Sequence, residues 1–271
     1  MKIATVNVNG VRAAYRKGMG EWLAEAAPEV ALLQEVRADE ATLSGLLGDG
    51  WTVVQQASDL KGRAGVAIAT TLDVTAVRIG LGTEKEAPVD TGRWVEADVV
   101  VPGLDVPLTL VSAYIHSGTV TDQQKMDNKY AHLRRTTARL SELTEQHAAG
   151  EREVLLAGDL NIVRTEQDIK NWKGNHNKTS GVLDDEIAFV DTWIDELGLV
   201  DVHRQLSGDV QGPYTWWSNR GKAFDNDAGW RIDYQLVTPG FAGRAQESQV
   251  DRAPSWDTRW SDHAPLVVTY A

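Results

Sequence analysis

Short apolar runs separated by turn-forming residues recur along the whole chain and predict a protein rich in β-strands. Most of these runs are rich in valine, isoleucine and leucine, as buried strands are. The predicted strands cover residues 2–8, 30–36, 51–57, 65–70, 74–80, 93–101, 108–115, 153–161, 231–238 and 264–270.

Helices are expected in four segments between these strands, at residues 17–27, 39–48, 122–148 and 185–197. The third segment is long and polar, as a surface helix is, and it starts at a residue suited to a helix cap, Thr121 or Asp122. Because strands and helices alternate and strands are more numerous, the pattern favours sheets packed face to face with helices outside. We find no linker and no low-complexity tract, so residues 1–271 are expected to form a single domain.

The composition narrows the class of protein. Hydrophobic residues make up 42% of the 271 positions and charged residues 24%, values typical of a globular protein. The chain has no cysteine, which excludes disulfides and thiolate metal sites and fits a reducing cytoplasm. No apolar stretch approaches the roughly 20 residues that span a bilayer, and the N-terminus does not resemble a signal peptide. We therefore expect a cytoplasmic protein that makes no membrane contact.

Polar residues stand at the ends of several buried-type strands: Asn7 and Asn9, Gln34 and Glu35, and Asp159 and Asn161, with Asp233 inside a fourth strand. Each of them alone could simply cap a turn. The alternative is that the strand ends converge at one edge of a sheet, where ligand sites often form. Residues two apart on a strand point to the same face, so Asp159 and Asn161 would reach one small volume together, as would Asn7 and Asn9. Carboxylates and amides without cysteine suit Mg²⁺ or Mn²⁺ better than Zn²⁺.

An acid and an imidazole, Asp262 and His263, stand directly before the last predicted strand, where strand formation needs neither. Pro265 follows them and cannot donate a backbone hydrogen bond. The reason for this placement has to come from what else the chain brings to the same place.

Seven motifs occur in order along nearly the whole chain: TVNVNGVR, LLQE, KGRAGVAI, AGDLNI, TWW, GWRIDY and SDHAPL. Together they resemble the exonuclease III family, which includes the major abasic-site endonucleases, within the endonuclease/exonuclease/phosphatase superfamily. The TWW and GWRIDY motifs indicate the DNA-repair branch. The resemblance implies a four-layered α/β sandwich of two packed sheets flanked by helices. It also implies a metal-dependent hydrolase that cleaves DNA 5′ to abasic sites, removes nucleotides or blocking groups from 3′ ends, or does both.

The resemblance also implies roles for individual residues. His263 would contact the scissile phosphate and stabilise its developing charge, while Asp233 would orient the imidazole. Without the other motifs, this pair would be best explained as a structural ion pair, and with them a catalytic role is favoured. Asp159 would orient or deprotonate the attacking water, and Asn7 and Asn161 would position Asp159 and the phosphate.

By the same resemblance, Tyr114 would donate a hydrogen bond to a phosphate oxygen, and Glu35 would be the principal ligand of Mg²⁺ or Mn²⁺. The implied metal region comprises Glu35, Asn7, Asp159, Asn161, Asp262 and His263. These roles agree with elementary chemistry, because a metal, a protonated imidazole and amide donors all stabilise the negative charge that grows on a phosphodiester under attack.

The candidate substrate contacts combine aromatic and cationic side chains. By resemblance, Trp217 and Trp230 would form the wall of a pocket that receives an extruded abasic sugar. Candidate contacts with backbone phosphates are Arg12, Lys61, Arg63 and Arg220. Packing of the tryptophans and solvation of the scattered charges are the simpler explanations.

The net charge of −12, taken alone, argues against a protein that binds a polyanion. A DNA enzyme needs only a local positive groove, however, and the acids cluster in segments expected to form outer helices. We therefore expect a monomeric enzyme whose partner is double-stranded DNA with abasic sites or 3′ ends, and whose nonspecific binding is weak and salt-dependent.

Two positions depart from the family pattern. Many relatives have proline and then asparagine after the tyrosine, whereas this chain has Ile115, His116, Ser117 and Gly118. His116 or Ser117 would then have to replace a phosphate-contacting amide. Some relatives have an acid where Asn9 stands, which puts a metal or water role for that residue in doubt.

Two other functions remain as alternatives. The same superfamily chemistry hydrolyses phosphate esters of lipids and small molecules, but TWW, GWRIDY and the lack of a membrane-binding segment argue against that substrate class. A non-catalytic DNA-binding module would need a degraded catalytic set. Against it, the residues of that set are all present, namely Glu35, Asp159, Asn161, Asp233 and His263.

Overall fold

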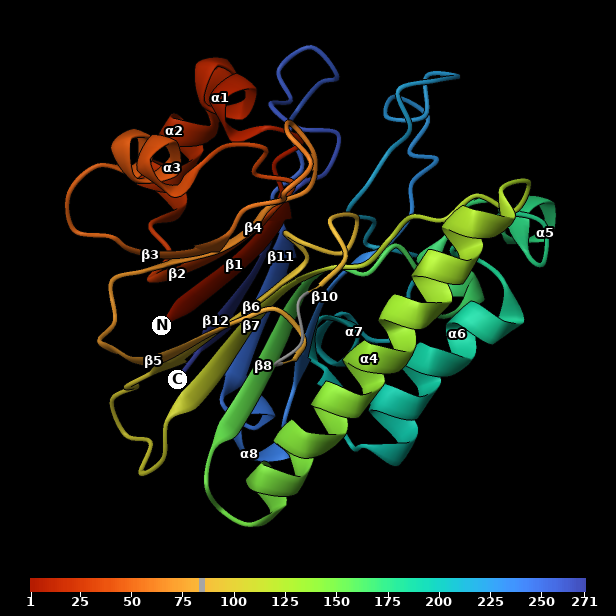
Figure 1. The fold of residues 1–271 in the computed structure, drawn as a ribbon. Coiled ribbons are helices and arrows are strands. Elements are labelled where there is room, and N and C mark those ends of the chain that lie inside the picture. The colour runs from red at the N-terminus through yellow and green to blue at the C-terminus, as the bar shows by residue number, and fades with distance from the viewer. Residues whose placement is uncertain (83–85) are drawn as a thin grey trace.

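Two six-stranded mixed β-sheets pack face to face at the centre of the computed structural model, which describes residues 1–82 and 86–271 (Figure 1). The first sheet has the order β11 (Ala245–Val250), β12 (Leu266–Tyr270), β1 (Lys2–Asn7), β2 (Val30–Gln34), β4 (Val66–Thr70) and β3 (Thr52–Gln56). The second has the order β5 (Val74–Ile79), β6 (Trp94–Val99), β7 (Leu108–Tyr114), β8 (Glu153–Asp159), β10 (Asp233–Val237) and β9 (Val200–Asp201). Side chains between the sheets, such as Leu32, Ile68, Leu110 and Leu155, are fully buried and form the central core.

Helices cover the outer faces of both sheets (Figure 1). The first sheet packs against α1 (Val11–Ala14), the π-helical turn Tyr15–Met19, α2 (Gly20–Ala26) and α3 (Glu40–Leu47). The second packs against α4 (Gln123–Ala148), α6 (Asp184–Asp191) and the π-helical turn Thr192–Glu196. Shorter helical segments are Glu166–Asp168, α5 (Trp172–Asn175), α7 (Val202–Ser207) and α8 (Pro239–Ala242). The predicted four-layered α/β sandwich is therefore confirmed. Across the described part of the chain, no helix is both long and apolar enough to span a membrane.

All the predicted strands form, and the long helix is capped by Asp122, whose carboxylate accepts a hydrogen bond from the backbone N–H of Lys125 at 3.2 Å. The sequence analysis missed β9, which has two residues, and β11. β11 reads AQESQV and lies at the edge of its sheet with no fully buried residue. An edge strand of this kind needs no apolar run, so its sequence resembles that of a loop.

The ends of the central strands meet at one edge of the two sheets. β1 and β2 are parallel and pair Asn7 with Gln34, while β7 and β8 are parallel and pair Tyr114 with Asp159. β10 runs antiparallel to β8, so it begins at this edge, where Asp233 pairs with Asp159. β12 runs antiparallel to β1 and begins here too, at Leu266, shortly after His263. The topology thus brings together polar residues that are up to 256 positions apart, since 263 − 7 = 256.

Candidate active site

The amide of Asn7 joins the two sheets at this edge. Its Nδ2 donates one hydrogen bond to Glu35 Oε1 and another to Asp159 Oδ2, both at 2.9 Å. Asn7 and Asp159 are almost completely buried. The two carboxylates therefore flank a single amide nitrogen, which fixes the position of each relative to the other. This arrangement confirms that the strand ends of β1, β2 and β8 converge.

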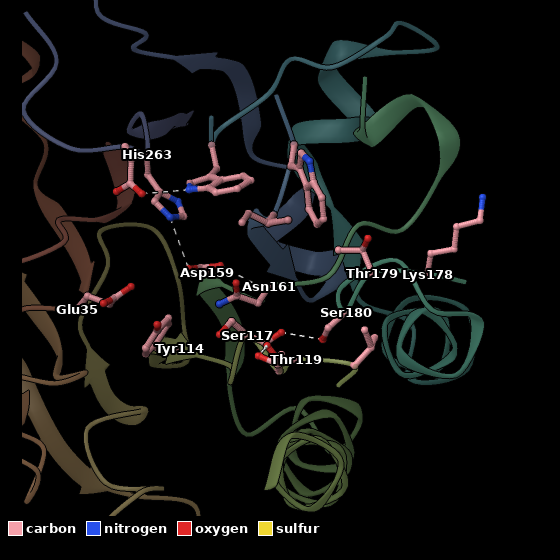
Figure 2. A pocket seen from close by; sticks show the side chains of 16 residues that line it. Glu35, Tyr114, Ser117, Thr119, Asp159, Asn161, Lys178, Thr179, Ser180 and His263 are labelled. Atoms are coloured by element: carbon pink, nitrogen blue, oxygen red, sulfur yellow. Dashed lines mark hydrogen bonds and ion pairs between the residues drawn. The ribbon is translucent and has the colours of Figure 1, made fainter. Parts of the chain in front are cut away.

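The imidazole of His263 lies between two carboxylates. Its Nδ1 is 2.8 Å from Asp233 Oδ2, and its Nε2 is 3.7 Å from Asp159 Oδ2. Burial alone would lower the pKa of His263, but the charges of Asp233 and Asp159 raise it to about 10. The group is therefore an imidazolium at neutral pH, held in one orientation by Asp233. Figure 2 shows His263 facing Asp159 across the cavity, with Glu35 and Tyr114 to one side.

Burial raises the pKa of the Asp159 carboxyl to about 7, a change that the His263 charge opposes and the Asp233 charge reinforces. Burial acts in the same direction on Glu35, but hydrogen bonds from Asn7 and the charge of Arg37 hold the pKa of Glu35 below its usual range. The surroundings therefore raise the pKa of Asp159 and lower that of Glu35. Such a difference allows one carboxylate of a site to accept a proton while the other stays charged.

The residues that follow the strands lie in left-handed turns: φ is 48° at Asn9, 49° at Glu35 and 50° at Asn161. The strands end at Asn7 and Asp159, so the expectation that Asn7–Asn9 and Asp159–Asn161 each share a strand face is wrong. Each turn instead lets the second residue fix the first, because the backbone N–H of Asn161 donates to Asp159 Oδ1 and that of Asn9 donates to Asn7 Oδ1, both at 3.0 Å.

Asp262 is held by two donors rather than by a pairing partner of opposite charge. Asn9 Nδ2 donates to its Oδ1 at 2.8 Å, and Trp216 Nε1 donates to its Oδ2 at 3.2 Å. Burial opposes ionisation, but the neighbouring His263 charge and these two hydrogen bonds lower the pKa of Asp262. Asn9, which departs from the family pattern, thus acts here as a support for Asp262.

A cavity of about 530 Å³ opens onto these groups, and its apolar wall consists of Trp216, Trp230 and Ile232. The two indoles meet edge to face with centroids 5.6 Å apart. Trp217, which the sequence analysis placed in this wall, does not line the cavity. It is 1% exposed, packs edge to face on Phe224, and donates from Nε1 to Asp227 Oδ1 at 3.0 Å. The backbone of Trp216 is extended and forms β-bridges with Trp230 and His263. Successive side chains of an extended segment point to opposite sides, so Trp216 faces the cavity and Trp217 does not.

A fully buried ion pair lies next to this cavity and joins α4 to α6, with Lys129 Nζ 2.9 Å from Glu186 Oε1. Lys129 also donates to the carbonyl oxygens of Asn161 at 3.0 Å and Ser117 at 3.3 Å. Ser117 therefore lines the cavity at the position where the family pattern departs, as Figure 2 shows. His116 is instead bound to Asp90 Oδ1 at 2.9 Å and does not line this cavity.

Two further cavities, one beside the first and one farther along, are lined by cationic side chains. One, of about 460 Å³, shares Glu35, Tyr114, Ser117 and Gly118 with the first cavity. The next, of about 370 Å³, contains three of the four predicted phosphate contacts, Arg12, Lys61 and Arg63. The fourth, Arg220, is exposed in a turn and lines none of these cavities.

The sequence analysis overlooked four cations that line the same cavities: Arg37, Arg93, Lys125 and Lys178. Arg37 could have been found, because it stands two residues after Glu35 and pairs with it. Arg93 gave no signal. Its guanidinium lies over the Tyr114 ring at 4.8 Å, a contact that only the packing of β6 on β7 reveals.

The donor set fits a hard cation held in part by water and substrate. Within residues 1–82 and 86–271, no three His, Asp or Glu side chains lie close enough together to form a metal cage. Glu35 and Asp159 present carboxylate oxygens around Asn7, and Mg²⁺ usually takes only one or two protein carboxylates beside phosphate and water. In the part of the chain that the structure describes, the buried acids Asp159 and Asp233 have one cation at ion-pair distance, His263, so added positive charge would stabilise them.

Comparison with known proteins agrees with this geometry. Residues 4–263 match the Endonuclease/Exonuclease/phosphatase family. An exodeoxyribonuclease of Bacillus subtilis (strain 168) is 28% identical over 267 residues, covering 98% of each chain. Two solved structures, an AP endonuclease from Archaeoglobus fulgidus and a 3′-5′ exonuclease from Neisseria meningitidis, each have a TM-score of 0.83 and 28% identity, and cover 100% of this chain and 99% of their own. Since the family match spans nearly the whole chain, this protein belongs to the Endonuclease/Exonuclease/phosphatase family.

Proposed function

We propose that residues 1–271 form one catalytic domain, a metal-dependent hydrolase of DNA phosphodiester bonds. It cleaves the backbone 5′ to abasic sites, removes nucleotides or blocking groups from 3′ ends, or does both. One observation carries the proposal: the His263 imidazole lies between Asp233 and Asp159 in a cavity walled by Trp216 and Trp230. DNA is favoured over a lipid or small-molecule ester because the relatives are named exodeoxyribonuclease, AP endonuclease and 3′-5′ exonuclease.

The chain's own residues divide the work of hydrolysis. Asp159 accepts a proton from the attacking water, because burial makes its carboxylate more basic. The water oxygen bonds to phosphorus as the bond to the leaving oxygen breaks, and the leaving oxygen takes up a proton from solvent water. The His263 imidazolium and the Tyr114 hydroxyl donate to the phosphate oxygens, where negative charge grows. Burial and the charges of Glu35 and Asp159 raise the pKa of Tyr114, so its proton is retained.

We propose Mg²⁺ or Mn²⁺ as the cofactor, held principally by Glu35 beside Asn7 and Asp159. When bound, such an ion stabilises charge on the phosphate oxygens. Glu35 suits this role because its pKa is lowered, which keeps it charged across the working pH range.

DNA and the protein are both negatively charged overall, so we propose that a local group of cationic side chains binds the DNA. Arg12, Lys61 and Arg63 lie in the cavity that adjoins the catalytic centre through Arg37. Contacts with backbone phosphates position a duplex without reading its sequence. We propose that a monomer binds double-stranded DNA along this path. We also propose that it acts in the cytoplasm, because a chain without cysteine forms no disulfides and so does not need an oxidising compartment.

The function is tested with purified protein and Mg²⁺ on a duplex that carries a stable abasic analogue. We expect cleavage 5′ to the analogue, no cleavage at the same position of an intact duplex, and no release of phosphate from a phosphoinositide. Excess EDTA should abolish the activity and Mg²⁺ or Mn²⁺ should restore it. Phosphate release from the phosphoinositide alone would support the alternative function, and full cleavage in EDTA would exclude the metal.

Replacing Glu35 with alanine is expected to raise the Mg²⁺ concentration needed for half-maximal rate and to lower the maximal rate. The reason is that the carboxylate is proposed to bind the ion directly. A Mg²⁺ titration of the initial rate measures both changes, with Glu25→Ala, an exposed acid on α2, as the control. An unchanged Mg²⁺ requirement would show that Glu35 does not bind the ion.

The two adjacent tryptophans should respond differently to substitution. Trp216→Ala is expected to reduce cleavage at the abasic analogue more than removal of a 3′ phosphate, because Trp216 walls the cavity proposed for the sugar. Trp217→Ala should instead lower the melting temperature, since truncating a buried aromatic residue costs about 3–5 kcal/mol. Rates on both substrates and thermal melts separate the two roles. Equal rate losses for Trp216→Ala on both substrates would contradict the proposed pocket.

A further inference from the structure

A fourth cavity, distinct from the three described above, adjoins the catalytic centre on the side of α1. It has a volume of about 370 Å³ and shares Asp262 with the tryptophan-walled cavity. Its other walls come from Asn9, from Ala13 and Lys17 at the N-terminal helical segment, and from the loop between β11 and β12. In Figure 1 this deep-blue loop stands beside α1 at the edge where the central strands end. A polymer that crosses the catalytic centre can therefore extend into this cavity without leaving the protein surface.

Trp256 in this loop has no packing role that accounts for it. All ten tryptophans lie in the described residues, and Trp256 alone is classed as exposed, at 52%. Single exposed apolar side chains are common on protein surfaces. Trp256 differs from them because it lines a cavity that also contains Asp262, the neighbour of His263, and two cations, Lys17 and Arg259.

Arg259 and Lys17 supply the positive charge of this cavity. The Arg259 guanidinium lies 5.5 Å from the Trp256 ring centroid and 5.3 Å from that of Phe224, and it donates to Asn219 Oδ1. These contacts tie the loop to the segment that follows Trp217. Lys17 is exposed, and among residues 1–82 and 86–271 it has no carboxylate at ion-pair distance.

The chemistry of the cavity matches one class of ligand. An exposed indole stacks on a nucleobase, whatever its identity, and cations beside it attract the phosphate backbone. The two acids in the walls, Asp257 and Asp262, are offset by Lys17 and Arg259, so the cavity does not repel a phosphate as the protein as a whole does. An apolar peptide would offer no partner to Lys17.

We propose that this cavity is a nucleotide subsite, in which Trp256 stacks on one DNA base near the reacting phosphate while Lys17 and Arg259 face its backbone. The inference rests on the proposed function and adds a residue that determines how DNA is held rather than how it is cleaved. Asn9, which lines this subsite and donates to Asp262, links its occupancy to the catalytic centre.

The test uses duplexes with an abasic analogue and 2-aminopurine placed, one duplex at a time, at each position flanking the analogue on either strand. In EDTA, where cleavage is not expected, the wild type should change the fluorescence of 2-aminopurine at the position that reaches Trp256. Trp256→Ala should abolish that change and weaken binding by about 5- to 150-fold, which is the range for one base stacked on an aromatic ring. Trp256→Phe should retain most of both.

Controls separate a subsite from a general loss of structure or charge. Val77→Ala, an exposed apolar residue on β5, and Arg134→Ala, an exposed cation on α4, should leave both signals unchanged. Unchanged affinity and fluorescence in Trp256→Ala, with cleavage intact in the wild type, would overturn the subsite and leave the proposed function standing. A wild type that neither binds nor cleaves the duplex would overturn both.

Discussion

Replacing His263 with alanine is expected to lower the turnover rate on abasic DNA by about 10²–10³, the typical value of one donor that stabilises charge in a transition state. The imidazole is held 2.8 Å from Asp233, and its pKa is raised to about 10, so it offers a charged donor at neutral pH. The effect should appear in the rate at saturating DNA more than in affinity, because the donor acts most strongly on the charge that develops during attack.

Asp233→Asn should also lower the rate, because an amide can hold the wrong imidazole tautomer and does not stabilise the imidazolium. The two losses should not add. Once His263 is absent, Asp233 has no ring to orient, so the double variant should resemble His263→Ala. Turnover is measured for the wild type, both single variants and the double variant.

Thermal melts of the same four proteins exclude the simpler explanation, a structural ion pair. That explanation requires melting temperatures to fall together while the rate per folded molecule stays near wild type. His147→Ala, at the end of α4, serves as the control for loss of an imidazole. Additive rate losses at unchanged stability would show that Asp233 has a second role independent of His263.

The fold could be predicted because the strands of its core consist mostly of consecutive apolar residues. Apart from Lys2, which is exposed, the residues of β1, β2, β4, β7 and β8 are all buried or nearly buried. These strands are covered on both faces, so they appear in the sequence as continuous apolar runs rather than as alternating patterns. β11 could not be predicted in the same way. It forms through backbone pairing with β12 along the sheet edge, and most of its side chains are polar, so no apolar run marks it in the sequence.

The site could be predicted to the level of the strand ends but not of the turns that follow them. Strand order places Asn7, Asp159 and Asp233 together, and motif resemblance names them. The left-handed turns at Asn9 and Asn161 are held by hydrogen bonds from their backbone N–H groups to the side chains two residues earlier. The alternation of side chains along a strand does not predict such turns. The same limit explains the confusion of Trp216 with Trp217. A one-residue change of register exchanges the two faces of an extended segment, and the two side chains are identical.

Replacing Asp159 with asparagine is expected to lower the turnover rate by about 10²–10⁴, the contribution typical of a positioned general base. Asparagine has nearly the same shape, and its one side-chain oxygen can still accept the hydrogen bond from Asn7 Nδ2, so the Asn7–Glu35 contact should survive. The hydrogen bond from the Asn161 backbone N–H is lost, because the amide nitrogen takes the place of the oxygen that accepts it, and the fold should tolerate the loss of this one bond. The melting temperature should therefore change little, in contrast to the rate. Trp217→Ala gives the opposite pattern and serves as the comparison.

The pH dependence makes this prediction specific to Asp159. Burial raises the pKa of the Asp159 carboxyl to about 7, so in the wild type the rate should fall as pH decreases and the base becomes protonated. A bound cation favours the carboxylate, so in Mg²⁺ this acid limb should lie at pH 7 or below. The alkaline limb should follow His263, which loses its proton near pH 10. Asp159→Asn should remove the acid limb from the residual activity, whereas Asp262→Asn should retain it. An acid limb that persists in Asp159→Asn and disappears in Asp262→Asn would move the role of general base to Asp262.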